Sequence, residues 1–270
     1  MNRVGQLLVC AVIVLGIGAC ASQDVISRSA RGEAAPYRMV DGRRQYQVPR
    51  LEGTITIDGV MDQAEWKDAL RISASHADFV QEGIGSSIWN INMGADAEPR
   101  AKRAEGTIAI FWSDEGLYLS ADIVDPTPTN YQPYGGQSNI QDAVQFAIDP
   151  DFQRGSAALQ DVYIIDLSMS EQGETYWYEY FQYGGHDAMA GIATAGGPTA
   201  TGWVVEAFIP WSALRAAGEQ FVPASGMEMG FGILMCDFAD PATLNDLYWD
   251  FGEMENTIDQ PGTWNSLVLR

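Results

Sequence analysis

The sequence predicts an all-β fold: an antiparallel β-sandwich of the immunoglobulin or jelly-roll type, with one or two short helices. Two patterns favour it, namely short segments in which apolar and polar residues alternate, and turns rich in Gly, Pro, Asn and Asp between them. A composition with 46% hydrophobic residues supplies enough apolar side chains for one large core. No internal repeat divides residues 46–270, so we expect them to form one domain.

The N-terminus predicts export and lipid attachment. Residues 7–15 form an apolar run that is too short to span a bilayer, and Ile17-Gly18-Ala19-Cys20 is similar to a lipobox. We therefore expect residues 1–19 to be a lipoprotein signal peptide and Cys20 to carry lipid. This places the protein in the bacterial cell envelope, anchored at the outer membrane or the periplasmic face. The alternative is an ordinary signal peptide or a retained short anchor.

Residues 20–45 are rich in Ser, Ala, Arg and Gly and show no periodicity, which predicts a flexible tether. The pattern changes at Tyr46, where the domain is expected to begin. Residues 54–57 alternate apolar and polar side chains, which predicts a strand that ends in an Asp58-Gly59 turn.

A short helix is expected directly after this turn. Asp62 and Glu65 have the spacing of a helix N-terminal capping pair, and Trp66 follows them on the predicted apolar face.

Beyond this helix, nearly every apolar segment predicts a strand. Residues 107–112 and 117–123 predict a hairpin with a tight turn at residues 113–116. The further predicted strands are residues 143–148, 163–167, 176–181, 203–209, 229–238, 247–251 and 263–269. Two longer stretches, residues 81–105 and 184–202, are expected to be loops that either decorate the surface or shape the rim of a binding site.

The net charge of the chain argues against anionic partners, and its cysteine content argues against an intrachain disulfide. The chain has 36 acidic and 15 basic residues, a net charge of −21, which repels nucleic acid and anionic headgroups and favours neutral ligands or hard cations. Of the 3 cysteines, Cys10 lies in the predicted leader and Cys20 is the predicted lipid attachment site. Cys236 is therefore expected to be a buried apolar residue without an intrachain disulfide.

Several ordered blocks carry a family resemblance. They are Ile57-Asp58-Gly59 with Asp62 and Trp66, residues 112–118, residues 142–150, and Glu206-Ala207-Phe208-Ile209-Pro210-Trp211. Together they resemble a family 9 carbohydrate-binding domain over residues 51–269. The resemblance implies a β-sandwich that binds carbohydrate without cleaving it, in the capture or degradation of polysaccharide. Four tryptophans lie on apolar faces of predicted elements and are expected in the core: Trp66, Trp112, Trp203 and Trp211.

Sugar binding requires flat aromatic faces and planar amide or carboxylate groups. In characterised members of the resembled family, two tryptophans clasp a terminal sugar, while a glutamate, an arginine and asparagines bind its hydroxyls. In this sequence the two clasp positions fall near Asn139 and Ile258, and the family glutamate corresponds to Gln145. The resemblance therefore implies an oligosaccharide or polysaccharide site at Gln145 that lacks the tryptophan clasp.

The candidate carbohydrate-binding residues centre on Gln145. They are Gln145, Asp142, Tyr131, Tyr134, Tyr176, Tyr178, Tyr180 and Trp264. The three tyrosines of residues 176–180 either form a platform for sugar rings or pack across neighbouring strands. Trp264 either lines the rim of the site or belongs to the core.

Calcium is a further expectation from the resemblance, because domains of that family bind structural calcium. The predicted ligands are Asp122, Asp125, Asp149 and Asp151. They lie in turns, where oxygen ligands can converge on a hard cation, although acidic turn residues are also commonly solvated. No catalytic cofactor is expected.

Two other functions remain open. Related sandwich domains hold haem through methionine and histidine, and Met227, Met229 and Met235 could serve, although methionine also fills cores. A module that binds another envelope protein would show a broad exposed apolar patch. The sequence has no nucleophile elbow, zinc motif, P-loop or dinucleotide fingerprint, so no enzymatic activity is expected.

Overall fold

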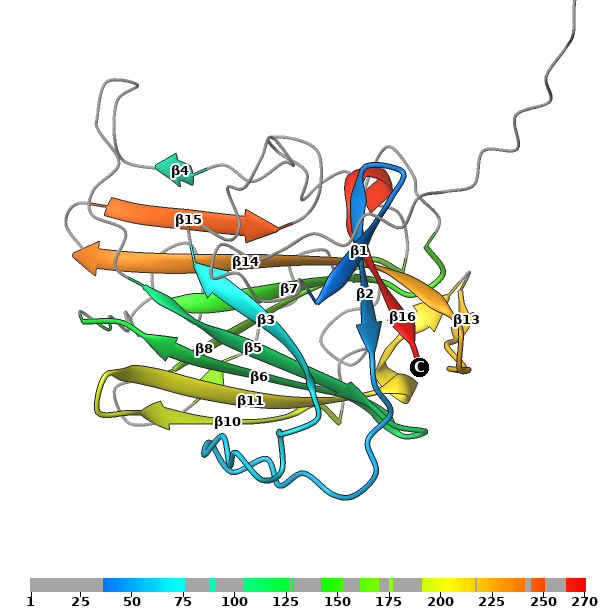
Figure 1. Ribbon diagram of the computed structural model, residues 1–270, viewed down its shortest axis with the longest axis horizontal. Helices are drawn as coiled ribbons and strands as arrows, with labels where there is room; N and C mark the ends of the chain where they lie inside the picture. Colours follow the sequence, from blue (N-terminus) through cyan, green and yellow to red (C-terminus); the bar gives the residue numbers. More distant parts are fainter. Residues whose placement is uncertain are drawn as a thin grey trace, which may run out of the picture.

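Two β-sheets pack against each other in the computed structural model, which confirms the predicted antiparallel sandwich (Figure 1). The structure describes residues 36–75, 88–90, 104–126, 128, 142–152, 161–169, 175–176, 191–216, 218–240, 244–250 and 261–270. None of the helices in these residues is both long and apolar enough to span a bilayer. The predicted leader, Cys20 and residues 21–35 of the expected tether lie outside them.

The larger sheet has nine strands. They are β1 (Tyr37–Val40), β2 (Arg43–Val48), β4 (Ile88–Asn90), β7 (Ala143–Asp149), β8 (Tyr163–Met169), β9 (Thr175–Tyr176), β14 (Glu228–Asp240), β15 (Leu244–Asp250) and β16 (Asn265–Leu269). Their order is β1-β2-β16-β14-β7-β8-β9, and β15 pairs with both β14 and β4. The pairing of β16 with β2 is parallel, whereas the other pairings are antiparallel.

The smaller sheet has five strands in the order β10-β11-β6-β5-β3. They are β3 (Leu70–Ser75), β5 (Glu105–Trp112), β6 (Gly116–Val124), β10 (Ala193–Pro198) and β11 (Gly202–Pro210). The remaining elements are β12 (Arg215–Ala216) and β13 (Glu219–Gln220), which pair with each other, and the 3₁₀ turns η5 (Trp211–Ala213) and η7 (Pro261–Thr263). The hairpin predicted over residues 107–123 is confirmed as β5 and β6.

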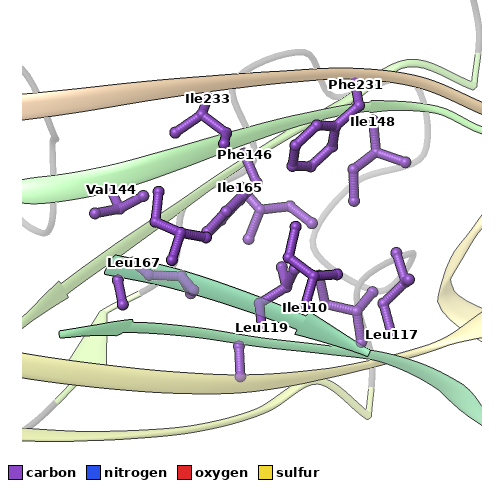
Figure 2. Packing of buried hydrophobic residues seen from close by; sticks show 14 of the residues in the cluster. Ile110, Leu117, Leu119, Val144, Phe146, Ile148, Ile165, Leu167, Phe231 and Ile233 are labelled. Atoms are coloured by element: carbon purple, nitrogen blue, oxygen red, sulfur yellow. The ribbon is translucent and has the colours of Figure 1, made fainter. Parts of the chain in front are cut away.

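The main core lies between the two sheets. Figure 2 shows Phe146 of β7 and Phe231 of β14 on one side, with Ile110 of β5 and Leu119 of β6 on the other. Each of these side chains is buried, and the alternation along the strands places every second residue in this layer. The four tryptophans predicted in the core are all buried, as is Cys236.

Both sheets are also covered on their outer faces. All seven residues of β7 are buried, although only alternate ones can face the sandwich core. A second apolar cluster lies on the outer side of β7 and β8, and a third lies on the outer side of the five-stranded sheet. Polar side chains at these outward positions are therefore enclosed, which matters for the candidate site below.

The nine-stranded sheet begins earlier than predicted. β1 starts at Tyr37, so the expected boundary between tether and domain at residue 46 is wrong. Asp41 and Gly42 both adopt positive φ, 49° and 80°, as the tight turn of a two-residue hairpin requires. The rings of Tyr37 and Tyr46 pair across this hairpin with centroids 5.5 Å apart. An Asp-Gly turn inside an arginine-rich stretch was the signal for it.

Residues 51–69 form neither the strand nor the helix predicted for them. They cross the outer face of the five-stranded sheet, where Met61 and Trp66 pack on Phe111. Ile55 is partly buried because it packs on this face, and not because it belongs to a strand of a sheet. The expected helix reduces to turns, with one helical bond from the Trp66 amide to the Asp62 carbonyl at 3.1 Å.

Strands also occur in the two stretches expected to be loops. β4 lies within residues 81–105, and β10 lies within residues 184–202. β10 consists of small residues and proline, Ala-Thr-Ala-Gly-Gly-Pro, which carry little of the apolar alternation that marks the other strands. β10 is an edge strand, so its backbone pairs with only one neighbouring strand of the sheet, β11.

Glu206 of β11 holds the segment of residues 51–69 on the five-stranded sheet through hydrogen bonds. Its carboxylate accepts hydrogen bonds from the amides of Asp58 and Gly59, at 3.1 and 2.9 Å, and from the indole nitrogen of Trp66, at 2.9 Å. Burial raises the pKa of this carboxyl above its ordinary value, while the three hydrogen bonds act in the opposite direction. The first and third sequence blocks therefore meet at one buried side chain.

Trp211 joins the third block to the second. Its amide donates to the Glu115 carbonyl at 3.0 Å, and its indole nitrogen donates to the Ser113 carbonyl at 2.7 Å. A Cβ added to Gly116 would lie 2.2 Å from the Ile209 carbonyl oxygen, so this turn of the β5–β6 hairpin accepts only glycine. These contacts make the blocks part of the scaffold of the sandwich.

Candidate functional site

The outer face of the nine-stranded sheet carries the polar residue on which the sequence prediction centred. Phe146 lies in the sandwich core, so its neighbours Gln145 and Ala147 face the opposite side of the sheet. β7 is flanked by β14 and β8, which puts Gln145 near the middle of the sheet and not at an edge. A rigid strand therefore fixes its position.

Gln145 is hydrogen-bonded to an acidic residue that the prediction did not include. In the β7–β8 ladder it lies directly opposite Asp166, and its side-chain nitrogen donates to Asp166 Oδ1. Gln145 is 4% exposed and Asp166 is 1% exposed. Because a carboxylate is costly to bury without a hydrogen bond, this amide stabilises Asp166 in its position.

Apolar side chains share the outer face with this pair. They are Ala143, Ala147, Val162, Ile164, Leu234, Cys236 and Trp264. The small alanines Ala143 and Ala147 flank Gln145 on this face of β7, so the polar pair is enclosed among apolar side chains. A face of this kind combines apolar contact with a few placed polar groups, which is the usual composition of a small-ligand site.

Trp264 belongs to this cluster and is fully buried. The structure thus decides between the two alternatives left by the sequence: Trp264 is a core side chain and not part of an exposed rim. Its place in the fold explains this, because it lies between η7 and β16, and all five residues of β16 are buried.

The other predicted site residues fall into two groups. Asp142 is buried directly before β7, and Tyr176 lies in β9, paired with Ser168 of β8. Asp142, Gln145 and Tyr176 are thus brought to the same sheet. The remaining four predictions lie outside the described residues: Tyr131, Tyr134, Tyr178 and Tyr180.

Asp166 is the site residue that sequence reasoning missed. It lies within the run Tyr163-Ile164-Ile165-Asp166-Leu167, which reads as a buried strand. An acidic side chain at the centre of such a strand was itself the signal, because it has to find a partner once the strand is enclosed. The partner could not be identified without the register of β7 on β8.

An open groove of about 690 Å³ lies on the outer side of the five-stranded sheet. It is lined by Pro49, Arg50, Leu51, Glu52, Gly53, Thr54, Ala64, Glu65, Lys67, Asp68 and Phe111. Two of its charged groups make local contacts: Arg50 pairs with Asp114, and Glu65 accepts hydrogen bonds from Thr56. None of the predicted site residues that the structure describes lines it.

The four predicted calcium ligands do not form one site. Asp122 lies on β6 of the five-stranded sheet and Asp125 directly follows this strand, whereas Asp149 ends β7 of the other sheet and Asp151 follows it. Within the described part of the chain, no three acidic, histidine or cysteine side chains are grouped as a metal site. Each pair would need further oxygen ligands to complete the six to eight that Ca²⁺ takes.

The methionines proposed as haem ligands serve the core. Met229 and Met235 are fully buried between the sheets, and Met227 packs against the same cluster. Core filling, the other use the sequence left open, is therefore the one observed.

Exposed large apolar residues in the described ranges are Val60, Val124 and Val222. Each belongs to a different segment, and apolar residues that are exposed singly are common on protein surfaces.

Comparison with known proteins identifies similar domains. A family model described as "Carbohydrate family 9 binding domain-like" matches residues 85–270. The fold is similar to a carbohydrate-binding module family 9 from Caldicellulosiruptor kristjanssonii solved with cellotriose, with a TM-score of 0.60 and 17% identity over 84% of this chain and 93% of that one. The same type of module from that organism, solved with glucose, gives a TM-score of 0.58 and 17% identity over 83% and 95%. No curated protein matches the chain.

Proposed function

The chain belongs to the family of carbohydrate family 9 binding domain-like proteins, and on this premise we propose that it binds an oligosaccharide or polysaccharide without cleaving it. The proposed site is the outer face of the nine-stranded sheet around Gln145. The observation that carries this location is the Gln145–Asp166 pair, a polar group fixed on a rigid strand within an apolar face.

The chemistry of this face suits a sugar. A pyranose ring presents an apolar side, which packs on apolar or aromatic groups, and equatorial hydroxyls, which need planar donors and acceptors. Gln145 and Asp166 supply an amide and a carboxylate, and Asp142 lies three residues before Gln145, directly before β7. Tyr176 on β9 and the tyrosines at 131, 134, 178 and 180 are the proposed aromatic contacts.

Two solved relatives indicate which sugars to test first. Their structures contain cellotriose and glucose, so short β-linked glucose oligomers are the first ligands to measure on this chain. We propose that the sugar is neutral, because a protein with a net charge of −21 repels anionic polymers.

Anchoring to the cell envelope completes the proposal. A lipid on Cys20 would hold the domain at a bacterial membrane, where it would capture polysaccharide for degradation by other proteins. Residues 21–35 between Cys20 and the described part of the chain could extend to about 50 Å, which would carry the sugar-binding face away from the headgroups. Metabolic labelling with a fatty acid, compared with a Cys20→Ser variant, tests the anchor.

Calcium binding is a separate part of the proposal. Asp149 and Asp151 in the turn after β7, and Asp122 and Asp125 at the end of β6, would each supply two carboxylates, with backbone carbonyls, water or other residues completing the shell. A structural ion would raise the melting temperature of the protein, and a chelator would remove this increase. An unchanged melting temperature after chelation would argue against the ion.

A glycan array on the full-length chain in detergent, followed by calorimetry with cellotriose, tests sugar binding. We expect a related set of neutral glycans to bind, and Gln145→Ala to lose most of the affinity. Gln45→Ala is the matched control, because Gln45 is also a buried amide on this sheet and also donates to a carboxylate, Glu228, at 2.7 Å. Folded wild-type protein that binds no glycan would contradict the function. Equal affinity in Gln145→Ala would contradict the location.

A further inference from the structure

We infer that the groove on the outer side of the five-stranded sheet binds an extended basic segment of a partner protein, which adds as a strand along residues 52–56. This groove and the proposed sugar site lie on different sheets of the sandwich, so peptide binding would be independent of sugar binding. Three features of the region point to such a ligand: the groove itself, an unpaired stretch of backbone beside it, and carboxylates without a cationic partner.

The groove forms where the chain departs from β5. The amide of Leu51 donates to the Trp112 carbonyl at 2.7 Å, which is the last backbone bond before the departure. Beyond this bond the chain runs as a loop and pairs with β5 again only as β3 (Figure 1). The groove of about 690 Å³ is lined on one side by residues 49–54 and on the other by residues 64–68, with the buried ring of Phe111 below.

The backbone beside this groove has open hydrogen-bonding groups. Exposure alternates from Thr54 to Ile57, as in an extended segment, but this segment pairs with no strand in the part of the chain that the structure describes. The amides and carbonyls of residues 53–55 likewise make no hydrogen bond to any described residue. Through unpaired groups of this kind, an exposed strand takes up an additional strand from another chain.

Glu65 shows which edge of the segment faces the groove. Its carboxylate lines the groove and accepts hydrogen bonds from the amide and the hydroxyl of Thr56, at 3.4 and 3.3 Å. In an extended chain the amides of alternate residues point to the same side, so the amide of Thr54 also faces the groove. The bond from the Thr56 amide is longer than the usual length of about 2.9 Å, so a peptide carbonyl can replace Glu65 there.

The charges of the groove favour a basic ligand. Each of its two basic side chains lies against an aspartate, whereas Glu52 and Glu65 have no cationic partner in the described ranges. The net charge of −21 on the whole chain adds to this attraction and would speed the encounter with a basic segment. An acidic segment would be repelled by the same groups.

The shape of the groove predicts the pattern of the ligand. Alternate side chains of an added strand lie on opposite faces, at a spacing of about 3.3 Å per residue. One set would contact the apolar floor formed by Phe111 and the partly buried Leu51, and the other set would extend to the exposed carboxylate of Glu52. A segment in which apolar and basic residues alternate fits both.

Fluorescence anisotropy with the full-length chain in detergent tests this surface. The probe is a labelled peptide of about six residues in which lysine and valine alternate. One control peptide carries glutamate in place of lysine, and a second carries N-methyl groups on its backbone amides. We expect the lysine peptide to bind at least about tenfold more tightly than either control. The N-methylated peptide keeps every positive charge, so it separates strand addition from simple attraction to an acidic protein.

Glu52→Lys is expected to weaken binding of the lysine peptide at least about fivefold, because it places a like charge at the rim of the groove. Glu219→Lys is the matched control, since Glu219 is an exposed residue of β13 outside the groove, and it should change the affinity by less than about twofold. Melting curves establish that both variants are folded.

Three results would overturn the inference: no binding of the lysine peptide to folded wild type, equal affinity for the N-methylated peptide, or equal effects of the two substitutions. Displacement of the peptide by cellotriose would assign the groove to a sugar and would overturn it too. Self-association of the protein that Glu52→Lys abolishes would assign the groove to a second copy of this chain, with the same consequence.

Discussion

The buried carboxylate of Glu206 accepts a hydrogen bond from the indole nitrogen of Trp66, at 2.9 Å, across 140 residues of sequence. The same carboxylate also accepts the amides of Asp58 and Gly59, so one side chain of β11 satisfies three donors of the segment that covers the five-stranded sheet. The three hydrogen bonds to this one carboxylate connect residues 58–66 to β11.

Glu206→Ala is expected to destabilise the protein by about 3 kcal/mol or more, because it leaves enclosed donors without an acceptor. Trp66→Phe removes only the indole donor while keeping an aromatic ring, and it should cost about 1–2 kcal/mol. Urea unfolding of both variants measures the difference. Similar losses in the two variants would mean that the backbone amides of residues 58 and 59 contribute little.

Stability should decrease with rising pH through the titration of Glu206. Burial raises its pKa in the folded protein above the ordinary value of 4.5, so between these two values the folded state binds more protons than the unfolded state. The contribution of Glu206 to the free energy of unfolding is therefore fully present below pH 4.5, and it is lost as the pH rises through the pKa of Glu206 in the folded protein. The difference in unfolding free energy between the wild type and Glu206→Gln, followed from pH 4 to 8, isolates this group. A flat difference would show that its pKa is not raised.

Gly116→Ala is expected to cost about 2–4 kcal/mol. The added Cβ would lie 2.2 Å from the Ile209 carbonyl oxygen. β6 and β11 would therefore have to separate at Gly116 and Pro210, the last pair of their ladder. Gly53→Ala is the matched control, since nothing lies within 4 Å of its Cβ position, and it should change stability by less than about 0.5 kcal/mol. Thermal unfolding of the two variants compares them directly, and equal melting temperatures would contradict the contact.

Trp264→Ala is expected to lower stability by about 3–5 kcal/mol, as for a large side chain removed from a core. Val222→Ala, at a position 72% exposed, is the surface control and should be within about 0.5 kcal/mol of the wild type. Chemical denaturation measures both. If Trp264→Ala changed sugar affinity and left stability intact, the residue would belong to the binding rim after all.

Alternation in the sequence predicted most of the sandwich. β6 and β11 carry apolar residues at every second position, and the core between the sheets selects that pattern directly. Residues 51–69 misled the prediction because a segment packed on a sheet face buries alternate residues just as a strand does. β1 was missed because Arg38, Arg43 and Arg44 give this stretch the composition of a tether, whereas its pairing with β2 and the packing of Tyr37 on the core stabilise it as a strand.

The candidate site was only partly accessible to sequence reasoning. Gln145 could be located from a family resemblance, because it lies in a strand with a clear pattern. Asp166, 21 residues later, has no local feature that links it to Gln145, and only the register of two strands brings them together. Trp264 illustrates the opposite case, where an aromatic residue near the end of the chain could equally have been exposed until the packing was known.

The position of β1 at the edge of the nine-stranded sheet determines which strand pairs a force on the N-terminal side opens first. β1 contacts only β2 in the sheet order, and β2 joins the rest of the sheet through β16. A pull on residues before 36 therefore acts first on the pair Tyr37–Tyr46 and opens the four pairs of β1 one after another, as in unzipping. Such a force therefore opens this outer hairpin before it reaches Leu267 and Leu269 of the core, and the sandwich stays closed while β1 detaches.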